Sequence, residues 1–211
     1  ETLAHNHEVH FFTRGEGKDI EVNGVQYHYC RPSGEDIVRY CSDMSRKMLD
    51  RFDEFDAPSF DLLHFHDWHV VDALHRLRDR ETVLTYHSTE FGRNGNRFSN
   101  GRPFTEISRI ERYGASIAKR ITAVSATLRR EAMSLYGIPD WKIDVVHNGI
   151  VPERYQADVD PEEIKRRHGF DPDSPLILFV GRLAWQKGPD MLVDAAPALL
   201  REHADSQIAF V

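Results

Sequence analysis

The 211 residues are enough for one large domain or two small ones, and either would bury a sizeable core. Charged residues make up 29% of the chain and hydrophobic residues 40%, and 27 basic against 34 acidic residues give a formal charge of −7, which argues against a broad nucleic-acid surface. No apolar run approaches a membrane span and no signal peptide opens the sequence, so we expect a cytoplasmic protein without a membrane span. Cys30 and Cys41 are too few for a disulfide framework, which also favours a reducing compartment.

Strands and helices are predicted to alternate along the chain, which indicates an α/β fold. A strand is expected over 7–13 and another over 25–30, after the turn signal Asn23-Gly24. Methionines and aromatic residues at helical spacing predict a core helix over 35–55. The next expected elements are a strand over 61–66, a helix over 70–80, a strand over 82–86, a helix over 104–120, a strand over 121–124, a helix capped by Ser125 and ending at Gly137, and a strand over 142–146.

Two polar residues directly follow neighbouring predicted strands. Asp67 comes after the strand over 61–66, and His87 after the strand over 82–86. The carboxyl ends of strands in an open parallel sheet form the edge where ligands bind, so Asp67 and His87 are candidates for catalysis. Each also has a structural alternative. A histidine at a strand end is commonly structural, and Asp67 could cap a helix that begins at Trp68.

A long polar connection is expected over 88–104, and loops of this length are usually functional or disordered. Its arginines, from Arg93 to Arg102, could form a flap over an acceptor. Glu111, on the helix that follows, could brace the same site. A solvated surface explains these residues equally well, so we do not count them among the candidate site residues.

The run H-F-H-D-W-H over 64–69 approaches the H-x-H-x-D-H pattern of zinc hydrolases, in which two histidines and a carboxylate share metals. That pattern requires an aspartate at the position of Trp68, so the register is wrong. A zinc-dependent hydrolase that uses His64, His66 and His69 is therefore an alternative, and we assign no metal site.

After a linker over 151–160 and a short helix over 161–169, the segment 176–200 combines a strand, a glycine turn and a helix start. Such a turn is a common anion site, because free N–H groups and the helix dipole face the ligand. Arg182 and Lys187 add two cations, and each charge-assisted hydrogen bond contributes about 1.5–3 kcal/mol against about 0.3–1 for a helix terminus. Pro197 is expected to kink or shorten the helix near Val193, and a further strand is expected over 207–211.

The turn G-R-L-A-W-Q-K-G over 181–188 resembles the G-R-L-x-x-x-K-G signature of family 4 glycosyltransferases. H-E-V-x-x-x-T-R over 7–14, H-D-W-H over 66–69 and N-G-I over 148–150 follow the order of the same family. The resemblance implies the GT-B fold, in which two Rossmann-like domains face each other across a cleft. We expect most of the first domain over 1–151 without its first strand, and only the start of the nucleotide-sugar-binding domain over 152–211. The resemblance also implies that the acidic motif with which the family binds the donor lies outside this sequence.

What the resemblance implies for function is the retaining transfer of a hexose, with glucose the expected one, from UDP-glucose or ADP-glucose to a saccharide hydroxyl. H-D-W-H is similar to a motif of glycogen and starch synthases. By the same resemblance, Arg182 and Lys187 hold the donor diphosphate, His87 contacts the donor sugar near the reacting carbon, and Asp67 orients a hydroxyl. No metal or other cofactor is expected, and the 211 residues alone are expected to be weak or inactive. A non-catalytic sugar-nucleotide-binding module is the second alternative.

Overall fold

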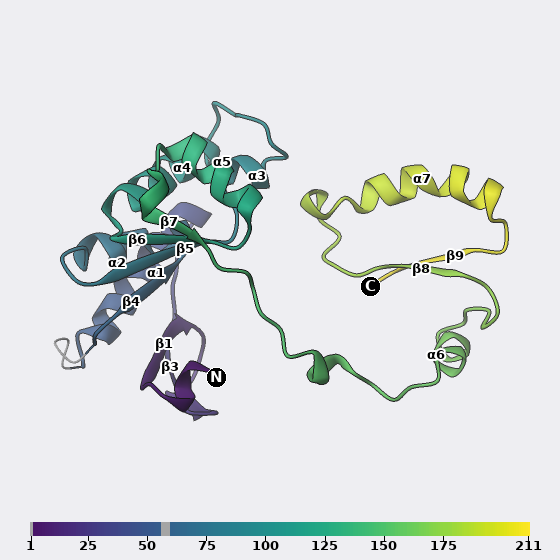
Figure 1. The fold of residues 1–211 in the computed structure, drawn as a ribbon, viewed down its shortest axis with the longest axis horizontal. Coiled ribbons are helices and arrows are strands. Elements are labelled where there is room, and N and C mark those ends of the chain that lie inside the picture. The colour runs from purple at the N-terminus through teal and green to yellow at the C-terminus, as the bar shows by residue number, and fades with distance from the viewer. Residues whose placement is uncertain (1, 56–59) are drawn as a thin grey trace. The chain divides into compact units, whose positions relative to one another are not determined.

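The computed structural model describes residues 2–55 and 60–211, and the chain divides into two compact units, residues 1–148 and 149–211 (Figure 1). Both units alternate helices with strands, so the α/β fold class expected from the sequence is confirmed. In the described residues, none of the helices combines the length and the apolar character that crossing a bilayer requires.

The first unit begins with a small three-stranded sheet in the order β1-β3-β2. A 3₁₀ turn, η1 (Leu3–His5), precedes β1 (Val9–Arg14), which pairs in parallel with β3 (Val25–Cys30). The intervening β2 (Ile20–Val22) is antiparallel to β3, and the predicted turn joins them. Asn23 and Gly24 both have positive φ, 51° and 77°, as a two-residue hairpin turn of this sequence requires.

Helix α1 (Ile37–Phe52) follows, and it is the core helix expected from its apolar spacing. The Asp36 side chain caps it by accepting a hydrogen bond from the Arg39 N–H at 2.8 Å. Cys41, Met44 and Phe52 lie on its buried face.

A four-stranded sheet in the order β4-β5-β6-β7, parallel throughout, forms the centre of the first unit. Its strands are β4 (Leu63–His66), β5 (Thr82–Tyr86), β6 (Arg120–Ala123) and β7 (Ile143–Val145). The connections carry η3 (Trp68–Val70), α2 (Val71–Arg76), α3 (Glu90–Arg93), α4 (Phe104–Ile117), α5 (Ala126–Tyr136) and η4 (Asp140–Lys142).

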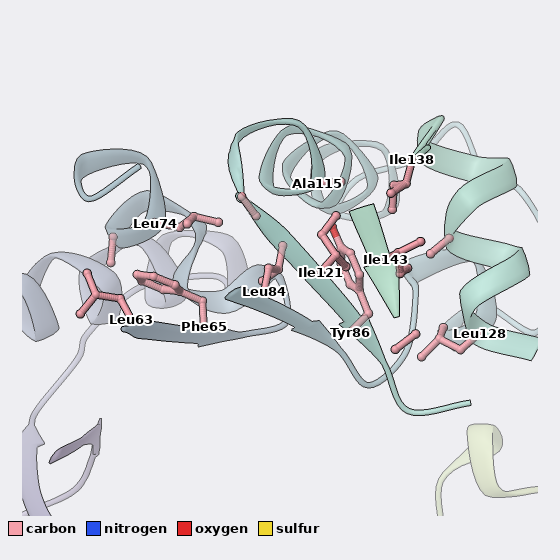
Figure 2. Packing of buried hydrophobic residues seen from close by; sticks show 14 of the residues in the cluster. Leu63, Phe65, Leu74, Leu84, Tyr86, Ala115, Ile121, Leu128, Ile138 and Ile143 are labelled. Atoms are coloured by element: carbon pink, nitrogen blue, oxygen red, sulfur yellow. The ribbon is translucent and has the colours of Figure 1, made fainter. Parts of the chain in front are cut away.

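The main core lies between this sheet and its helices (Figure 2). Leu84, Ile121 and Ile143 point into it from three neighbouring strands and are fully buried. Burial of an aliphatic side chain contributes about 1.5–3 kcal/mol, so this layer fixes the sheet and the strand ends. The two caps predicted for α5 are confirmed, because the Ser125 hydroxyl accepts from Leu128 N–H at 3.1 Å and Gly137 ends the helix at φ 70°.

The opposite face of the sheet carries polar side chains. Along β4, Leu63 and Phe65 are buried while His64 and His66 are exposed, which confirms the alternation expected from the sequence. His64 Nε2 lies 2.6 Å from Thr85 Oγ1, and that hydroxyl lies 2.6 Å from Thr122 Oγ1. A hydrogen-bonded row of side chains therefore crosses three strands on this face.

The second unit contains two parallel strands, β8 (Leu176–Phe179) and β9 (Gln207–Phe210), joined through α7 (Pro189–Glu202). Its other elements are η5 (Pro152–Tyr155), α6 (Pro161–Arg167) and η6 (Trp185–Lys187). Pro189 occupies the first turn of α7, as expected. The expected shortening at Pro197 is wrong, since α7 runs through it; a proline removes one backbone hydrogen bond, and the turns on either side persist.

Candidate functional site

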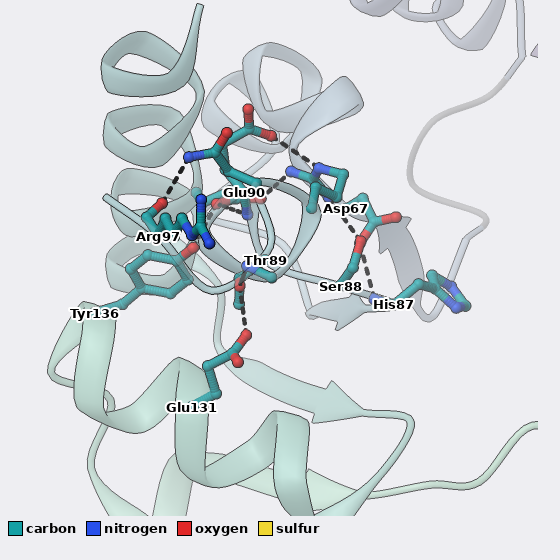
Figure 3. Close-up of polar contacts among 12 residues, drawn as sticks. Asp67, His87, Ser88, Thr89, Glu90, Arg97, Glu131 and Tyr136 are labelled. Carbon is teal, nitrogen blue, oxygen red and sulfur yellow. Dashed lines mark hydrogen bonds and ion pairs between the residues drawn. The ribbon is translucent and has the colours of Figure 1, made fainter. Parts of the chain in front are cut away.

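Asp67 and His87 meet at the carboxyl edge of the four-stranded sheet. The register pairs His66 of β4 with Thr85 of β5, which places Asp67 level with Tyr86, one residue before His87. Asp67 N–H donates to the Thr85 carbonyl at 2.8 Å, and Asp67 Oδ1 accepts from the His87 N–H at 2.8 Å (Figure 3). The structure thus brings together the two candidates that the sequence places at neighbouring strand ends.

The backbone of Asp67 adopts a conformation that few residues other than glycine tolerate. Its φ is 55° and its ψ is −171°, and such a conformation costs about 1–3 kcal/mol. The capping alternative is not what the structure shows, because in the described chain the Asp67 side chain caps no N–H of η3. The strained backbone instead directs the carboxylate to His87.

Three histidines stand in a row at this edge. The His64 and His66 rings have centroids 4.3 Å apart, and the His66 and His87 rings are stacked at 5.3 Å. His66 Nδ1 lies 3.0 Å from His87 Nε2, so one nitrogen donates and the other accepts. The surrounding protein reduces the hydration of His66, and this desolvation, together with the neighbouring imidazoles of His64 and His87, lowers the pKa of His66 to about 4. His66 is therefore a neutral partner for His87 at pH 7.

The geometry gives the zinc alternative no support. His64 bonds to Thr85, His66 bonds to His87, and the His69 ring stacks on Trp68 at 4.6 Å. Throughout residues 2–55 and 60–211, no group of three or more histidine, cysteine, aspartate or glutamate side chains is placed to hold one ion.

The connection after His87 is more ordered than the sequence predicts, because it opens with helix α3. The Thr89 hydroxyl caps α3 by accepting from Gly92 N–H at 2.9 Å, and it donates to Glu131 of α5. The polar connection expected over 88–104 thus begins with a short helix that the sequence analysis does not predict. A helix of four residues leaves little periodicity to detect, and its signal is the capping threonine followed by Glu90.

Glu111, which the sequence analysis leaves out of the candidate site residues, lies in the interior beside the site. Its side chain is fully buried, so the interpretation as a solvated helix face is wrong. Its carboxylate accepts hydrogen bonds from the Glu90 N–H at 2.9 Å, from the Arg93 guanidinium and from the Tyr136 hydroxyl. Burial raises the pKa of Glu111, while Arg93 and the other two donors favour its charged form. The sequence does contain a signal, because Glu111 follows the buried Ile107 by four residues, on one face of α4.

Arg93 is likewise part of the interior network. Its guanidinium bonds to Glu90 at 2.8 Å, to the Ser88 hydroxyl at 2.8 Å and to Glu111. The interpretation of this arginine as a solvated loop residue is wrong, because a buried carboxylate and a turn both take hydrogen bonds from it.

The candidate diphosphate site lies in the second unit, on the turn between β8 and α7. Gly181 extends the chain after β8 with φ 158°, and Gly188 adopts a left-handed conformation with φ 67° directly before α7. Arg182 and Lys187 are exposed on this turn, and neither forms an ion pair with any carboxylate that the structure describes. Both cations are available to an anionic ligand.

Two families match the chain. The family described as Glycosyltransferase Family 4 matches residues 1–154, and the family described as Glycosyl transferases group 1 matches residues 160–211. An uncharacterized glycosyltransferase from Methanocaldococcus jannaschii is 32% identical over 210 residues, which cover 95% of this chain and 53% of that protein. A glycogen synthase from Mycobacterium tuberculosis is 31% identical over 146 residues, covering 68% of this chain and 33% of that enzyme. The chain therefore spans about half the length or less of these relatives.

Solved structures of similar fold include sucrose-phosphate synthase from Thermosynechococcus elongatus, with a TM-score of 0.72 and 15% identity over 100% of this chain and 61% of that one. HepE from Anabaena, solved in complex with UDP-glucose, has a TM-score of 0.63 and 16% identity over 87% of this chain and 46% of that one. These likenesses confirm the expected GT-B fold class.

Proposed function

The chain belongs to the family 4 glycosyltransferases, and from this premise we propose that the full-length protein is a retaining enzyme that moves a hexose from a nucleotide sugar to a saccharide hydroxyl. The proposed hexose is glucose and the proposed donor is UDP-glucose or ADP-glucose. The proposal includes a cytoplasmic location, which two buried cysteines without a disulfide, Cys30 and Cys41, support.

The observation that carries the proposal is the hydrogen bond from the His87 N–H to the Asp67 carboxylate. It puts an imidazole and a carboxylate at the edge of a parallel sheet, where ligands of such folds bind. In the proposed role, His87 positions the donor sugar. It also stabilises the positive charge that develops on the sugar ring as the bond between the sugar and the diphosphate breaks. Asp67 fixes the His87 backbone and supplies a negative charge beside it.

Arg182 and Lys187 are the proposed holders of the donor diphosphate. Negative charge grows on the diphosphate as it leaves, and fixed cations stabilise that charge more in the transition state than in the bound donor. Two exposed cations on a glycine turn at the start of a 14-residue helix suit this ligand. Because these side chains supply the positive charge, the proposed reaction needs no metal ion.

Two kinds of support favour glucose and a nucleotide-sugar donor. Among the relatives is a glycogen synthase, and the H-D-W-H run over 66–69 is similar to a motif of glycogen and starch synthases. Among the structural neighbours is a protein solved with UDP-glucose. We extend both properties to this chain as part of the proposal.

A transfer assay with the full-length protein tests the proposal. UDP-glucose and ADP-glucose are supplied with maltooligosaccharides, and NMR of the product reports whether the anomeric configuration is retained. We expect transfer with retention, and a His87→Ala variant should lose about a hundredfold in turnover, on the scale of one lost transition-state contact. Inversion of configuration, or full activity of the variant, would overturn the proposal.

The same assay separates an enzyme from a non-catalytic sugar-nucleotide-binding module. A module of that kind would be stabilised thermally by UDP-glucose or ADP-glucose and would neither transfer nor hydrolyse the sugar. Binding at a hundred times the dissociation constant raises stability by about 2.7 kcal/mol, so a thermal-shift experiment detects it. The isolated 211-residue chain, assayed in parallel, is expected to be weak or inactive.

A further inference from the structure

The short segment from His87 to Arg93 is held by three carboxylates that come from three different elements (Figure 3). Asp67, after β4, accepts from the His87 N–H. Glu131 of α5 accepts from the Thr89 hydroxyl, and Glu111 of α4 accepts from the Glu90 N–H. The proposed catalytic histidine thus begins a segment whose shape is set by distant side chains.

We propose that Glu111 is a positioning residue for His87, an inference that rests on the proposed function. Glu111 holds the chain on both sides of the histidine. Its main-chain carbonyl accepts from the Tyr86 hydroxyl at 2.6 Å, directly before His87, and its carboxylate accepts from the Glu90 N–H, three residues after it. One residue therefore fixes both ends of the strand-to-helix turn that presents the imidazole.

The carboxylate uses both of its oxygens for this purpose. Oε1 accepts from the Arg93 guanidinium, while Oε2 accepts from the Glu90 N–H and the Tyr136 hydroxyl. A charged carboxylate accepts hydrogen bonds only, and all three partners are donors. The site is therefore built for the ionised form, and the paired guanidinium compensates the burial of the charge.

Arg93 carries the restraint to the residue next to the histidine. Besides Glu111, its guanidinium bonds to the Ser88 hydroxyl at 2.8 Å and to the Glu90 carboxylate at 2.8 Å. The network thus closes over the turn between β5 and α3. A loosened Glu111 would release Ser88 and Glu90 together, and misplacement of a reacting group by about 1 Å can lower a rate a hundredfold.

A double-mutant cycle in the full-length protein separates positioning from a merely structural role. The substitutions are Glu111→Gln and His87→Ala, singly and together, and the turnover number is measured for sugar transfer from UDP-glucose or ADP-glucose, whichever donor the wild type uses. Glutamine keeps the shape and one acceptor oxygen but removes the charge that binds Arg93. The matched control is Glu81→Gln at the opposite end of β5, which removes an exposed ion pair with Lys119 at 2.9 Å.

We expect Glu111→Gln to lower turnover at least tenfold when His87 is present and less than twofold when it is absent, because its effect passes through the histidine. A loss of folded protein would lower turnover by the same factor in both backgrounds, so equal factors would overturn the inference. Unchanged turnover in folded Glu111→Gln would also overturn it. The control should change turnover less than twofold.

Tyr136→Phe carries the same test if Glu111→Gln does not fold, because it removes only one hydroxyl from the network. A loss of at least threefold with His87 present and none without it is the expected result, and equal losses in both backgrounds would overturn the inference. The proposed function fails separately. If His87→Ala alone keeps full turnover, the site assignment is wrong whatever Glu111 does.

Discussion

Asp67 Oδ1 accepts a hydrogen bond from the His87 N–H at 2.8 Å, and this bond joins the ends of two neighbouring parallel strands. The residue that accepts it has a backbone conformation with φ 55° and ψ −171°. A strained residue that persists at a sheet edge is held there by the contacts around it, and here the contact leads to the proposed catalytic histidine.

Replacement of Asp67 by glycine and by alanine measures this strain. Both variants lose the carboxylate, but only glycine relaxes at this φ and ψ. After the extra flexibility of glycine in the unfolded chain is allowed for, Asp67→Ala should be less stable than Asp67→Gly by about 1 kcal/mol. Urea unfolding of the two variants checks this prediction, and an alanine variant as stable as the glycine variant would contradict it.

Loss of either cation on the turn between β8 and α7 should impair transfer. Arg182→Gln and Lys187→Gln are each expected to lower turnover by about a hundredfold, the scale of one lost donor to a developing negative charge. Steady-state kinetics with saturating donor provides the measurement. Arg166→Gln is the matched control, because Arg166 is an exposed arginine of the same unit whose ion pair is with Glu162 at 2.7 Å. A loss of turnover below threefold in both variants would refute the proposal that Arg182 and Lys187 hold the donor diphosphate.

Acid should destabilise the protein through its histidines. The pKa of His66 is lowered to about 4 in the folded chain, against 6.5 for the ordinary side chain. Between these values the unfolded state binds a proton that the folded state does not, so the stability present above pH 6.5 is lost as the pH falls towards 4. His64 and His69, whose pKa values are also lowered by partial desolvation, act in the same direction.

Thermal unfolding followed from pH 7.5 to 4 checks this dependence. The Tm of the wild type should fall with pH, and the fall should be smaller in His66→Asn, which keeps a polar group near His87 but does not titrate. An equal fall in both proteins would exclude His66 as a source of the acid sensitivity.

Gly114 of α4 lies where α2 and β5 approach the helix closely. A Cβ at this position would lie 2.8 Å from Val71 Cγ2 and 3.2 Å from Leu84 Cδ2. Alanine gains about 1 kcal/mol of helix propensity over glycine, but overpacking a core costs about 1–3 kcal/mol. We therefore expect Gly114→Ala to lower the free energy of unfolding by about 1 kcal/mol. Chemical denaturation measures it, with Ser116→Ala on the exposed side of α4 as the control. A Gly114→Ala variant that is more stable than the wild type would contradict the prediction and would show that α2 moves to make room for the methyl group.

Metal removal should leave transfer unchanged, because Arg182 and Lys187 supply the charge that a divalent ion provides in other transferases. The full-length protein is treated with EDTA, desalted and assayed, and its metal content is measured before and after treatment. Activity that disappears with EDTA and returns with one equivalent of a divalent ion would contradict the prediction.

Local sequence signals predict much of the first unit. The bounds of β5 match the expected strand at both ends, Ser125 and Gly137 cap α5 as expected, and Asp67 and His87 lie together because consecutive parallel strands end at one edge. These features depend on nearby residues or on the order of the strands. The sequence carries them directly.

The interior network could not be predicted in the same way. Arg93 and Tyr136 lie 18 and 25 residues from Glu111 along the chain, and each of the three alone is typical of a solvated helix or loop. Their burial depends on how α3, α4 and α5 pack against one another. The free-energy cost of burying a charged side chain in the interior depends on partners that are distant in sequence. The flanking apolar residues of α4 indicate the face on which Glu111 lies, but they do not indicate which residues donate hydrogen bonds to its carboxylate.

The three acids that hold the histidine turn also limit how this region can be transplanted. A chimaera that imports only the seven residues after β5 into another scaffold would leave their anchors behind. The recipient must already carry acceptors equivalent to Asp67 after a neighbouring strand and to Glu111 and Glu131 within two helices. Exchange of sugar specificity by loop grafting would therefore need to move the supporting helices α4 and α5 with the loop.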